Sequence, residues 1–314
     1  MNDDIRDLLQ DAVADVQPTD GLAGIRARTA SHRRRRGWAW GVGGAVAATA
    51  ATVAVVATLG TGGHGPARRD STSQVASGGT RVTAYFVGTT GAGPRLFGQQ
   101  VTVPPGAPAL DVTVDMAVRG RASDPDYRSP WPAGTRMQHA QLANGVLSVD
   151  LSGPVVRRPS GTTATDADVA VQQLVYTVQA ASGERLPVTF LLDGRPAPTV
   201  LGVDTTRPVA REAADDVLSP LSIDTPGQGA RVGTTFTVRG HAATFEGNVR
   251  WQLLQGGVVF REGSTTAKEC CTLAPYSFRV EAPAGSYLLK VFEEDDSDGE
   301  GVAPSSDTKQ ITVR

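Results

Sequence analysis

The chain has 314 residues, enough for about two globular domains, and its formal net charge of -2 provides no overall field to recruit nucleic acid. Aromatic residues make up only 5% of the sequence, whereas 36 glycines and 20 prolines favour short strands joined by many turns. Cys270 and Cys271 are the two cysteines, and their adjacency excludes a disulfide framework and a CxxC metal site.

The N-terminal 36 residues contain one amphipathic pattern, which runs from Ile5 to Val16 and ends before Pro18. So small an apolar stripe cannot form a core of its own, so this helix either docks on a cytoplasmic partner, or it rests on the membrane surface or is loosely ordered. We favour the second alternative, because the cytoplasmic part has only about 36 residues and carries no metal-ligand motif.

Residues 37–59 are uncharged and consist mainly of Ala, Val, Gly and Thr. At about 1.5 Å per residue they extend roughly 34 Å, slightly more than the hydrocarbon core of a bilayer. The arginine block at residues 33–36 precedes them, and Trp38 and Trp40 lie where interfacial aromatics are expected. The run is too long and too far from the N-terminus for a signal peptide. The sequence therefore predicts a single-pass membrane protein with a cytoplasmic N-terminus and extracytoplasmic C-terminal domains.

The region from residue 80 to residue 205 predicts a compact α+β domain. Two β-branched and aromatic runs flank the loop GTTGAGP and predict a hairpin, and two further strands surround the turn ANG. Residues 107–120 fit a helix, although Val112 also fits the alternation of a strand. The apolar positions on that helical face are Leu110, Val114, Ala117 and Val118.

A second helix is predicted after residue 164, with Thr165 or Asp166 as its N-cap and Gly183 at its end. The last strand is predicted in LPVTFLLDGRP. The element order is then β-β-α-β-β-α-β, with helices packed on a mostly antiparallel sheet. The strings RVTAYFV, SPWPAGTRM, NGVLSVDLSG, ATDADVAVQQLVYTV and VTFLLDGRP together resemble the sporulation and spore germination GerM domain, often written GerMN.

Residues 220–314 predict an all-β sandwich, because seven short runs alternate with period two and show no helical pattern. Trp251 is the expected central core residue. The string SIDTPGQGARVGTTFTVRGHAATFEGNVRWQLL resembles the immunoglobulin-like domain of bacterial spore germination, a frequent C-terminal companion of the GerM domain.

No catalytic or cofactor-binding motif is present: the sequence lacks a G-x-S-x-G elbow, an H-E-x-x-H pair and a phosphate-binding loop. His139 and His241 are the histidines left for a site, and we expect both at surfaces or strand edges. Asp150 ends a strand, where an aspartate usually accepts hydrogen bonds from turn amides. We therefore expect a non-enzymatic protein without cofactor.

Two weaker features remain open. Asp296, Asp298 and Glu300 alternate in EEDDSDGEG and are a weak candidate for calcium, although a solvated hairpin tip fits better. Cys270 and Cys271 form either a vicinal disulfide or a bond between chains, or remain as unpaired or buried thiols.

The predicted organisation is a cytoplasmic segment, a transmembrane helix, a flexible linker, a GerM-type domain, a connector and an immunoglobulin-like sandwich. Their bounds are residues 1–36, 37–59, 60–79, 80–205, 206–219 and 220–314. The resemblance implies an assembly or interaction protein of the bacterial cell envelope, and the Arg/Ala/Gly-rich composition points to an actinobacterium. Two alternatives are recognition of cell-wall glycan or peptidoglycan and transmembrane signalling through a cytoplasmic partner of the first helix.

Overall fold

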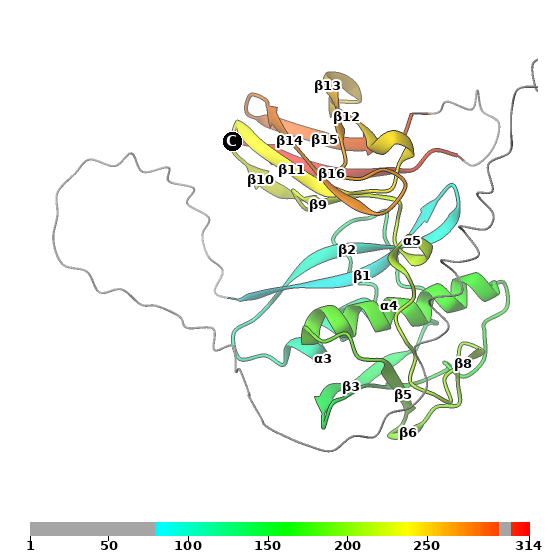
Figure 1. Cartoon of the computed structure of the whole chain (residues 1–314). Helices are drawn as coiled ribbons and strands as arrows, with labels where there is room; N and C mark the ends of the chain where they lie inside the picture. Colours follow the sequence, from blue (N-terminus) through cyan, green and yellow to red (C-terminus); the bar gives the residue numbers. More distant parts are fainter. Residues whose placement is uncertain (1–78, 295–302) are drawn as a thin grey trace, which may run out of the picture. The chain divides into compact units, whose positions relative to one another are not determined.

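The computed structural model describes residues 79–294 and 303–314 (Figure 1). The predicted cytoplasmic segment, the predicted span over residues 37–59 and nearly all of the predicted linker lie outside the described residues. Asp296, Asp298 and Glu300 lie outside them as well. Within the two described ranges, no helix is both long and apolar enough to cross a membrane.

The first domain begins with seven elements in the predicted order β-β-α-β-β-α-β. These are β1 (Thr80–Thr90), β2 (Gly93–Val103), α3 (Ala109–Val118), β3 (Arg136–Ala143), β4 (Val146–Ser152), α4 (Ala164–Ser182) and β5 (Val188–Leu192). Three two-residue strands follow, namely β6 (Arg195–Pro196), β7 (Thr199–Val200) and β8 (Val203–Asp204). The ambiguous run over residues 107–120 is helical at α3, where burial of Val114, Ala117 and Val118 follows helical spacing.

The N-cap of α4 is Thr163, so the prediction of Thr165 or Asp166 was wrong. Thr163 Oγ1 accepts a hydrogen bond from Asp166 N at 3.0 Å, and Asp166 Oδ2 accepts one from Thr163 N at 3.1 Å. Asp166 is thus the third helical residue of a reciprocal capping box rather than the cap itself. Gly183 ends the helix at φ 76°, as predicted.

The strands of this domain do not form the single, mostly antiparallel sheet that we expected. β1 and β2 form a separate two-stranded sheet, while β3, β4, β5 and β6 form a four-stranded sheet in which β4 and β5 are parallel. The parallel pair arises because α4 connects β4 to β5, and a helical crossover returns the chain in the same direction. α4 lies between the two sheets (Figure 1). Leu174 and Val178 in α4 belong to the same buried cluster as Val149 and Phe190 of the larger sheet.

The second domain is the predicted sandwich of two sheets. Its elements are β9 (Leu221–Thr225), β10 (Ala230–Val232), β11 (Thr235–Ala242), η1 (Phe245–Gly247), β12 (Asn248–Gln255), β13 (Val258–Thr266), β14 (Ala274–Glu281), β15 (Gly285–Phe292) and β16 (Ser306–Val313). One sheet has the order β10-β16-β15-β12-β13 and the other β14-β11-β9. We did not predict β10 from the sequence. This three-residue strand, which is parallel to β16, lies between Gly229 and Gly233 and is too short to show an alternation.

Trp251 lies in the sandwich core, as predicted, with 8% of its surface exposed. Its ring stacks on Phe278 with the centroids 4.9 Å apart. Val249 and Leu253 on the same strand are fully buried, so the period-two pattern of β12 correctly identified its inward face.

The connector between the domains is packed rather than extended. Its helix α5 (Ala214–Val217) buries Val217 in a cluster with Val87, Leu96 and Tyr176 of the first domain. Immediately after α5, Ser219 N donates a hydrogen bond to Leu96 O at 2.9 Å. The chain therefore leaves the first domain along the edge of β2 and enters the sandwich at β9.

Candidate interdomain site

An acid and a base occupy the inward face of β16. Asp307 and Lys309 are buried in the same alternating row as Ile311 and Val313. We did not predict this pair from the sequence, although its signal is present there. In DTKQITV, the alternation that buries Ile311 and Val313 also turns Asp307 and Lys309 inward.

The buried ammonium group of Lys309 meets oxygen atoms from both domains. It donates to Asp307 Oδ1 at 2.7 Å and to Tyr127 Oη at 2.6 Å. Lys309 Nζ also lies 2.9 Å from Asp124 Oδ2. These two groups form an ion pair, but their geometry is not that of a hydrogen bond. Tyr127 and Asp124 belong to the loop between α3 and β3, so these contacts join the first domain to the last strand of the sandwich.

The Asp307 carboxylate is held from several sides. Besides Lys309, it accepts hydrogen bonds from the Tyr127 hydroxyl at 2.9 Å and from Ile223 N at 2.7 Å. Burial raises the pKa of Asp307, while Lys309 and the other donors act in the opposite direction. Burial and the nearby carboxylates of Asp307 and Asp124 raise the pKa of Tyr127, so its hydroxyl stays protonated and able to donate.

We call Asp124, Tyr127, Asp307 and Lys309 the ionic cluster. Each of the four side chains is at most 7% exposed. A lysine whose ammonium group is paired in this way is not available as a nucleophile, because nucleophilic attack needs a neutral amine. The arrangement instead fixes the loop over residues 123–127 against the sandwich.

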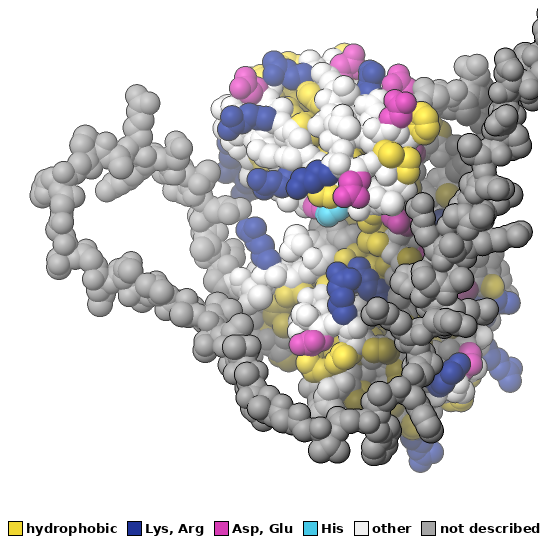
Figure 2. All heavy atoms as spheres, in the orientation of Figure 1, with side chains coloured by type: hydrophobic (Ala, Val, Ile, Leu, Met, Phe, Trp, Pro, Cys, Tyr) yellow, Lys and Arg dark blue, Asp and Glu magenta, His cyan; other side chains and the backbone are white. Residues whose placement is uncertain are grey.

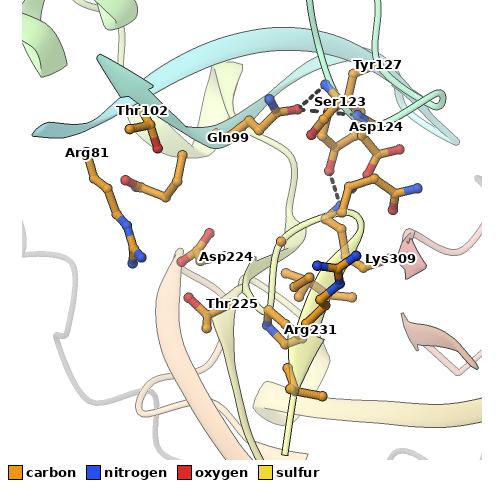
Figure 3. Close-up of a pocket in the computed structure, with 18 residues that line it drawn as sticks. Arg81, Gln99, Thr102, Ser123, Asp124, Tyr127, Asp224, Thr225, Arg231 and Lys309 are labelled. Carbon is orange, nitrogen blue, oxygen red and sulfur yellow. Dashed lines mark hydrogen bonds and ion pairs between the residues drawn. The ribbon is translucent and has the colours of Figure 1, made fainter. Parts of the chain in front are cut away.

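A cleft of about 460 Å³ opens beside the ionic cluster (Figure 3). We call it the interdomain cleft. One side is formed by β1 and β2 and the facing side by the turn after β9, with Arg81 and Arg231 reaching in from opposite domains. The residues that line the cleft include Arg81, Gly98, Gln100, Thr102, Asp224 and Arg231.

A second cavity of about 430 Å³ adjoins the interdomain cleft and shares Gly98, Gln100 and Asp224 with it. His241 lines the second cavity, and its Nδ1 lies 2.7 Å from Asp224 Oδ2. This hydrogen bond raises the pKa of His241, although partial burial opposes the shift. Figure 2 shows several Lys and Arg side chains bordering the hollow between the two domains.

The structure places the sequence-predicted candidates apart from one another. His139 Nδ1 lies 3.1 Å from Asp111 Oδ1 in the first domain, whereas His241 pairs with Asp224 in the second. Asp150 Oδ1 accepts a hydrogen bond from Gly194 N at 3.1 Å, the turn role that we expected.

Cys270 and Cys271 are free and exposed, so they are neither a disulfide nor buried thiols in this structure. Over residues 79–294 and 303–314, no group of three or more His, Cys, Asp or Glu side chains is arranged to hold a metal ion.

Two family models match the chain. Residues 83–198 match Germane, described as sporulation and spore germination. Residues 221–300 match Gmad2, described as the immunoglobulin-like domain of bacterial spore germination. Neither description is that of an enzyme family. A comparison with curated proteins gives no match.

Three solved structures are similar to parts of the chain. The tandem GerMN domains of the sporulation protein GerM from Bacillus subtilis are 14% identical, with a TM-score of 0.32, over 64% of this chain and 62% of that one. A Clostridium perfringens protein described as a lipoprotein is 16% identical, with a TM-score of 0.29, over 42% and 87% of the two chains. CopC from Methylosinus trichosporium OB3b is 19% identical, with a TM-score of 0.22, over 30% and 92%.

The order of the two family matches is that of the two described domains. The Germane match covers most of the α+β domain, and the Gmad2 match begins at the first residue of β9. The chain therefore carries a segment similar to the sporulation and spore germination family, followed by a segment similar to the immunoglobulin-like domain of bacterial spore germination, which supports a germination-related protein.

Proposed function

We propose that this chain is a non-enzymatic interaction protein of the bacterial cell envelope, anchored by residues 37–59, with both folded domains outside the cytoplasmic membrane. The two family matches support a role related to germination. Among the described residues, neither His139 nor His241 is hydrogen-bonded to a serine or cysteine, so neither is placed to activate a nucleophile.

The observation that carries this proposal is the outer strand β13. It is the last strand of the order β10-β16-β15-β12-β13, so one side of its backbone is paired with no other strand of the described chain. At its far end, Thr265 Oγ1 donates a hydrogen bond to Ser277 O of β14 at 3.4 Å. Its first three residues are apolar and exposed, at 71% for Val258, 42% for Val259 and 43% for Phe260. Proteins usually protect such an edge with charge, proline or a covering element. In β13 the charged residues, Arg261 and Glu262, follow the apolar stretch, so the first part of the strand is the surface best suited to strand addition.

We assign this edge to an extended segment of another envelope protein. Three exposed apolar residues form a small patch, whereas a stable dimer interface buries on the order of 1,200 Å² or more. Main-chain pairing along β13 would give affinity to a short segment, and the Val258–Phe260 patch would select its side chains.

Recognition of cell-wall glycan is less well supported. Sugar-binding surfaces commonly present exposed aromatic rings, and tryptophan is foremost among them, yet Trp131 and Trp251 are only 7% and 8% exposed. Among the described residues, the exposed aromatic rings are those of Phe245 and Phe260, which have no polar group to orient a sugar. Trp131 is further occupied by its own fold, because its Nε1 donates to Gln173 Oε1 at 2.8 Å.

The experiment is site-specific photo-crosslinking in intact cells. A photoreactive residue replaces Val259 in the full-length chain, and the same residue at Arg279 on β14 of the other sheet is the control. We expect a crosslink to a different protein at position 259, absent at position 279 and lost when Phe260→Lys adds charge to the edge. A crosslink only between copies of this chain, or none at position 259, would overturn the assignment.

A further inference from the structure

The hydrogen bonds around the β1–β2 hairpin show which of its residues direct their backbone N–H and C=O groups away from the partner strand. Val87 and Leu96 are directly opposite each other in the antiparallel register. Val87 exchanges two hydrogen bonds with Arg128, and Leu96 O accepts one from Ser219 N, so both residues direct their backbone groups away from the hairpin. Because this direction alternates along a strand, Gly98, Gln100 and Thr102 of β2 also point outward.

The outward groups of the two strands meet different surroundings. On β1, Tyr85 N donates to Thr177 Oγ1 at 3.1 Å and Tyr85 O accepts from Gln173 Nε2 at 2.8 Å, so α4 satisfies that edge. On β2, no described residue forms a hydrogen bond with the backbone of Gly98, Gln100 or Thr102. These three residues line the interdomain cleft.

The segment that precedes β9 pairs with the edge of β2 at one position only. Leu218 forms a parallel bridge with Leu96, and the chain then turns away into β9. Beyond that bridge lies Gly98, where a Cβ atom would lie 3.1 Å from Thr83 Cγ2 of the same hairpin. Because the residue is a glycine, no side chain from this position projects into the cleft that it lines.

The charges around the cleft favour an anionic occupant. Arg81 and Arg231 are exposed and form no salt bridge with any described residue, and Figure 3 shows them reaching in from opposite domains. The two aspartates of the cleft are already paired, Asp124 with Lys309 and Asp224 with His241. The unpaired arginines are therefore left to bind carboxylates.

We propose that the interdomain cleft binds an extended acidic peptide, which adds as a strand to the free edge of β2 while its carboxylates pair with Arg81 and Arg231. This site is separate from β13, and the proposal does not depend on the function proposed above. The cleft differs from a simple anion site because its recognition would require the backbone of the ligand as well as its charge.

The test measures binding of labelled synthetic peptides to the full-length chain in detergent micelles by fluorescence anisotropy. The probe is a peptide of about eight residues that alternates valine and glutamate, near the usual length of a strand. One control replaces glutamate by lysine, and a second carries N-methyl groups on alternate backbone nitrogens. We expect binding of the glutamate peptide alone, since N-methylation removes the edge hydrogen bonds and leaves the charge unchanged.

Matched variants distinguish the contribution of the β2 backbone to peptide binding from the contribution of side chains. Gln100→Pro removes an outward N–H that the fold does not use, whereas Gln100→Ala removes the side-chain bond to Thr83 Oγ1 and keeps that N–H. We expect Gln100→Pro to weaken binding about tenfold or more and Gln100→Ala to have an effect of less than about threefold. Arg81→Gln and Arg231→Gln should each weaken binding several-fold, most at low salt, while Arg279→Gln on β14 should not.

Three outcomes would overturn the proposal. In the first, the N-methylated and unmodified peptides bind equally well. In the second, the Gln100→Pro variant binds the glutamate peptide as well as the wild type does. In the third, the glutamate peptide does not bind at about 1 mM. If Gln100→Pro does not fold, the N-methylated peptide gives the same test on the unaltered protein. A Phe260→Lys variant at β13 should bind the peptide normally, so failure here is distinguishable from failure of the proposed function.

Discussion

Three oxygen-bearing side chains from two domains surround the ammonium group of Lys309, at 2.6 Å from Tyr127, 2.7 Å from Asp307 and 2.9 Å from Asp124. Transferring charges from water into such a buried place is costly, and their mutual attraction offsets that cost only while each partner is present. Removal of a single member of the ionic cluster should therefore lower the stability of the protein strongly, because it leaves a buried charge without its partner.

We predict that Lys309→Met lowers the free energy of unfolding by about 3–5 kcal/mol, because two buried aspartates lose their cation while the volume stays similar. Urea unfolding at neutral pH measures the change. The loss should shrink as the pH falls toward about 4, since burial raises the pKa of Asp307 and its protonation removes an uncompensated charge. Lys268→Met at an exposed position should change stability by less than about 0.5 kcal/mol. A loss below about 1 kcal/mol for Lys309→Met would contradict this account.

His241 provides a milder, pH-dependent contribution. Its hydrogen bond to Asp224 raises the pKa in the folded state, so the stabilisation is fully present below about 6.5, the unfolded value. It is lost as the pH rises through the folded pKa. Because the His241 side chain is 45% exposed, we expect less than about 1 kcal/mol.

The measurement is the melting temperature of the wild type and of His241→Gln between about pH 6 and pH 8.5. The wild type should lose stability over this range more steeply than the variant. Asp224→Asn should reduce the slope to a similar extent, since it removes the other partner of the same pair. Equal slopes in all three proteins would show that this pair contributes nothing to the pH dependence.

At the scale of elements, α4 holds the first domain together. Its apolar residues pack on the larger sheet, and Thr177 and Gln173 bond to the backbone of β1. The start of α4 is fixed by the Thr163–Asp166 capping box.

We predict that Thr163→Ala destabilises the protein by about 1 kcal/mol, because the cap satisfies backbone N–H groups that the helix itself leaves unpaired. Thermal or urea unfolding measures this. Thr165→Ala is the matched control two residues later, where a threonine lies inside the helix and should be replaced with little effect. The hydrogen bonds from Thr163 lower the pKa of Asp166, so the cost of the substitution should decrease when the pH falls below about 3.9. An equal effect of both substitutions would mean that the box does not stabilise α4.

Elements with a strong period were predictable from sequence. The long apolar stripe of α4 and the alternation around Trp251 were predicted correctly, because helical and strand periods differ over several turns or residue pairs. The cap was misplaced because threonine occurs at 162, 163 and 165. The arrangement of the strands in two sheets was missed because strand pairing depends on contacts far apart in the sequence.

The cleft could not be predicted for the same reason. Its residues come from the β1–β2 hairpin, the loop over residues 123–127, the turn after β9, and β16. Each of these segments is unremarkable by composition. Only Asp307 and Lys309 left a readable signal, as charged residues in the inward row of a strand.

At the scale of the whole molecule, the connector packs on the first domain, and the ionic cluster joins that domain to the sandwich. Val217 of the connector packs against Val87, Leu96 and Tyr176, and the ionic cluster holds the loop over residues 123–127 against β16. Three members of the cluster, Asp124, Tyr127 and Lys309, line the interdomain cleft. A ligand that bridges Arg81 and Arg231 would therefore bind to both domains at once.

The proposed orientation in the membrane can be tested with cysteines that the protein already has. Cys270 and Cys271 are the chain's two cysteines, and both are exposed in the sandwich. If residues 37–59 span the membrane with the arginine block at residues 33–36 inside, both thiols lie outside. A membrane-impermeant maleimide added to intact cells should then label the full-length chain, after treatment with an impermeant phosphine to reduce any disulfide.

The control places one cysteine on the opposite side of the proposed span. Ser31→Cys in a Cys270→Ser, Cys271→Ser background should be labelled only after the cells are permeabilised, because residue 31 precedes the arginine block. Labelling of both proteins in intact cells would indicate leaky cells rather than topology, and a cytosolic marker protein identifies that case. If Cys270 and Cys271 become reactive only after permeabilisation, the sandwich is inside the cell. The charge asymmetry around residues 37–59 would then not determine orientation, and a partner of the β13 edge would have to be sought in the cytoplasm.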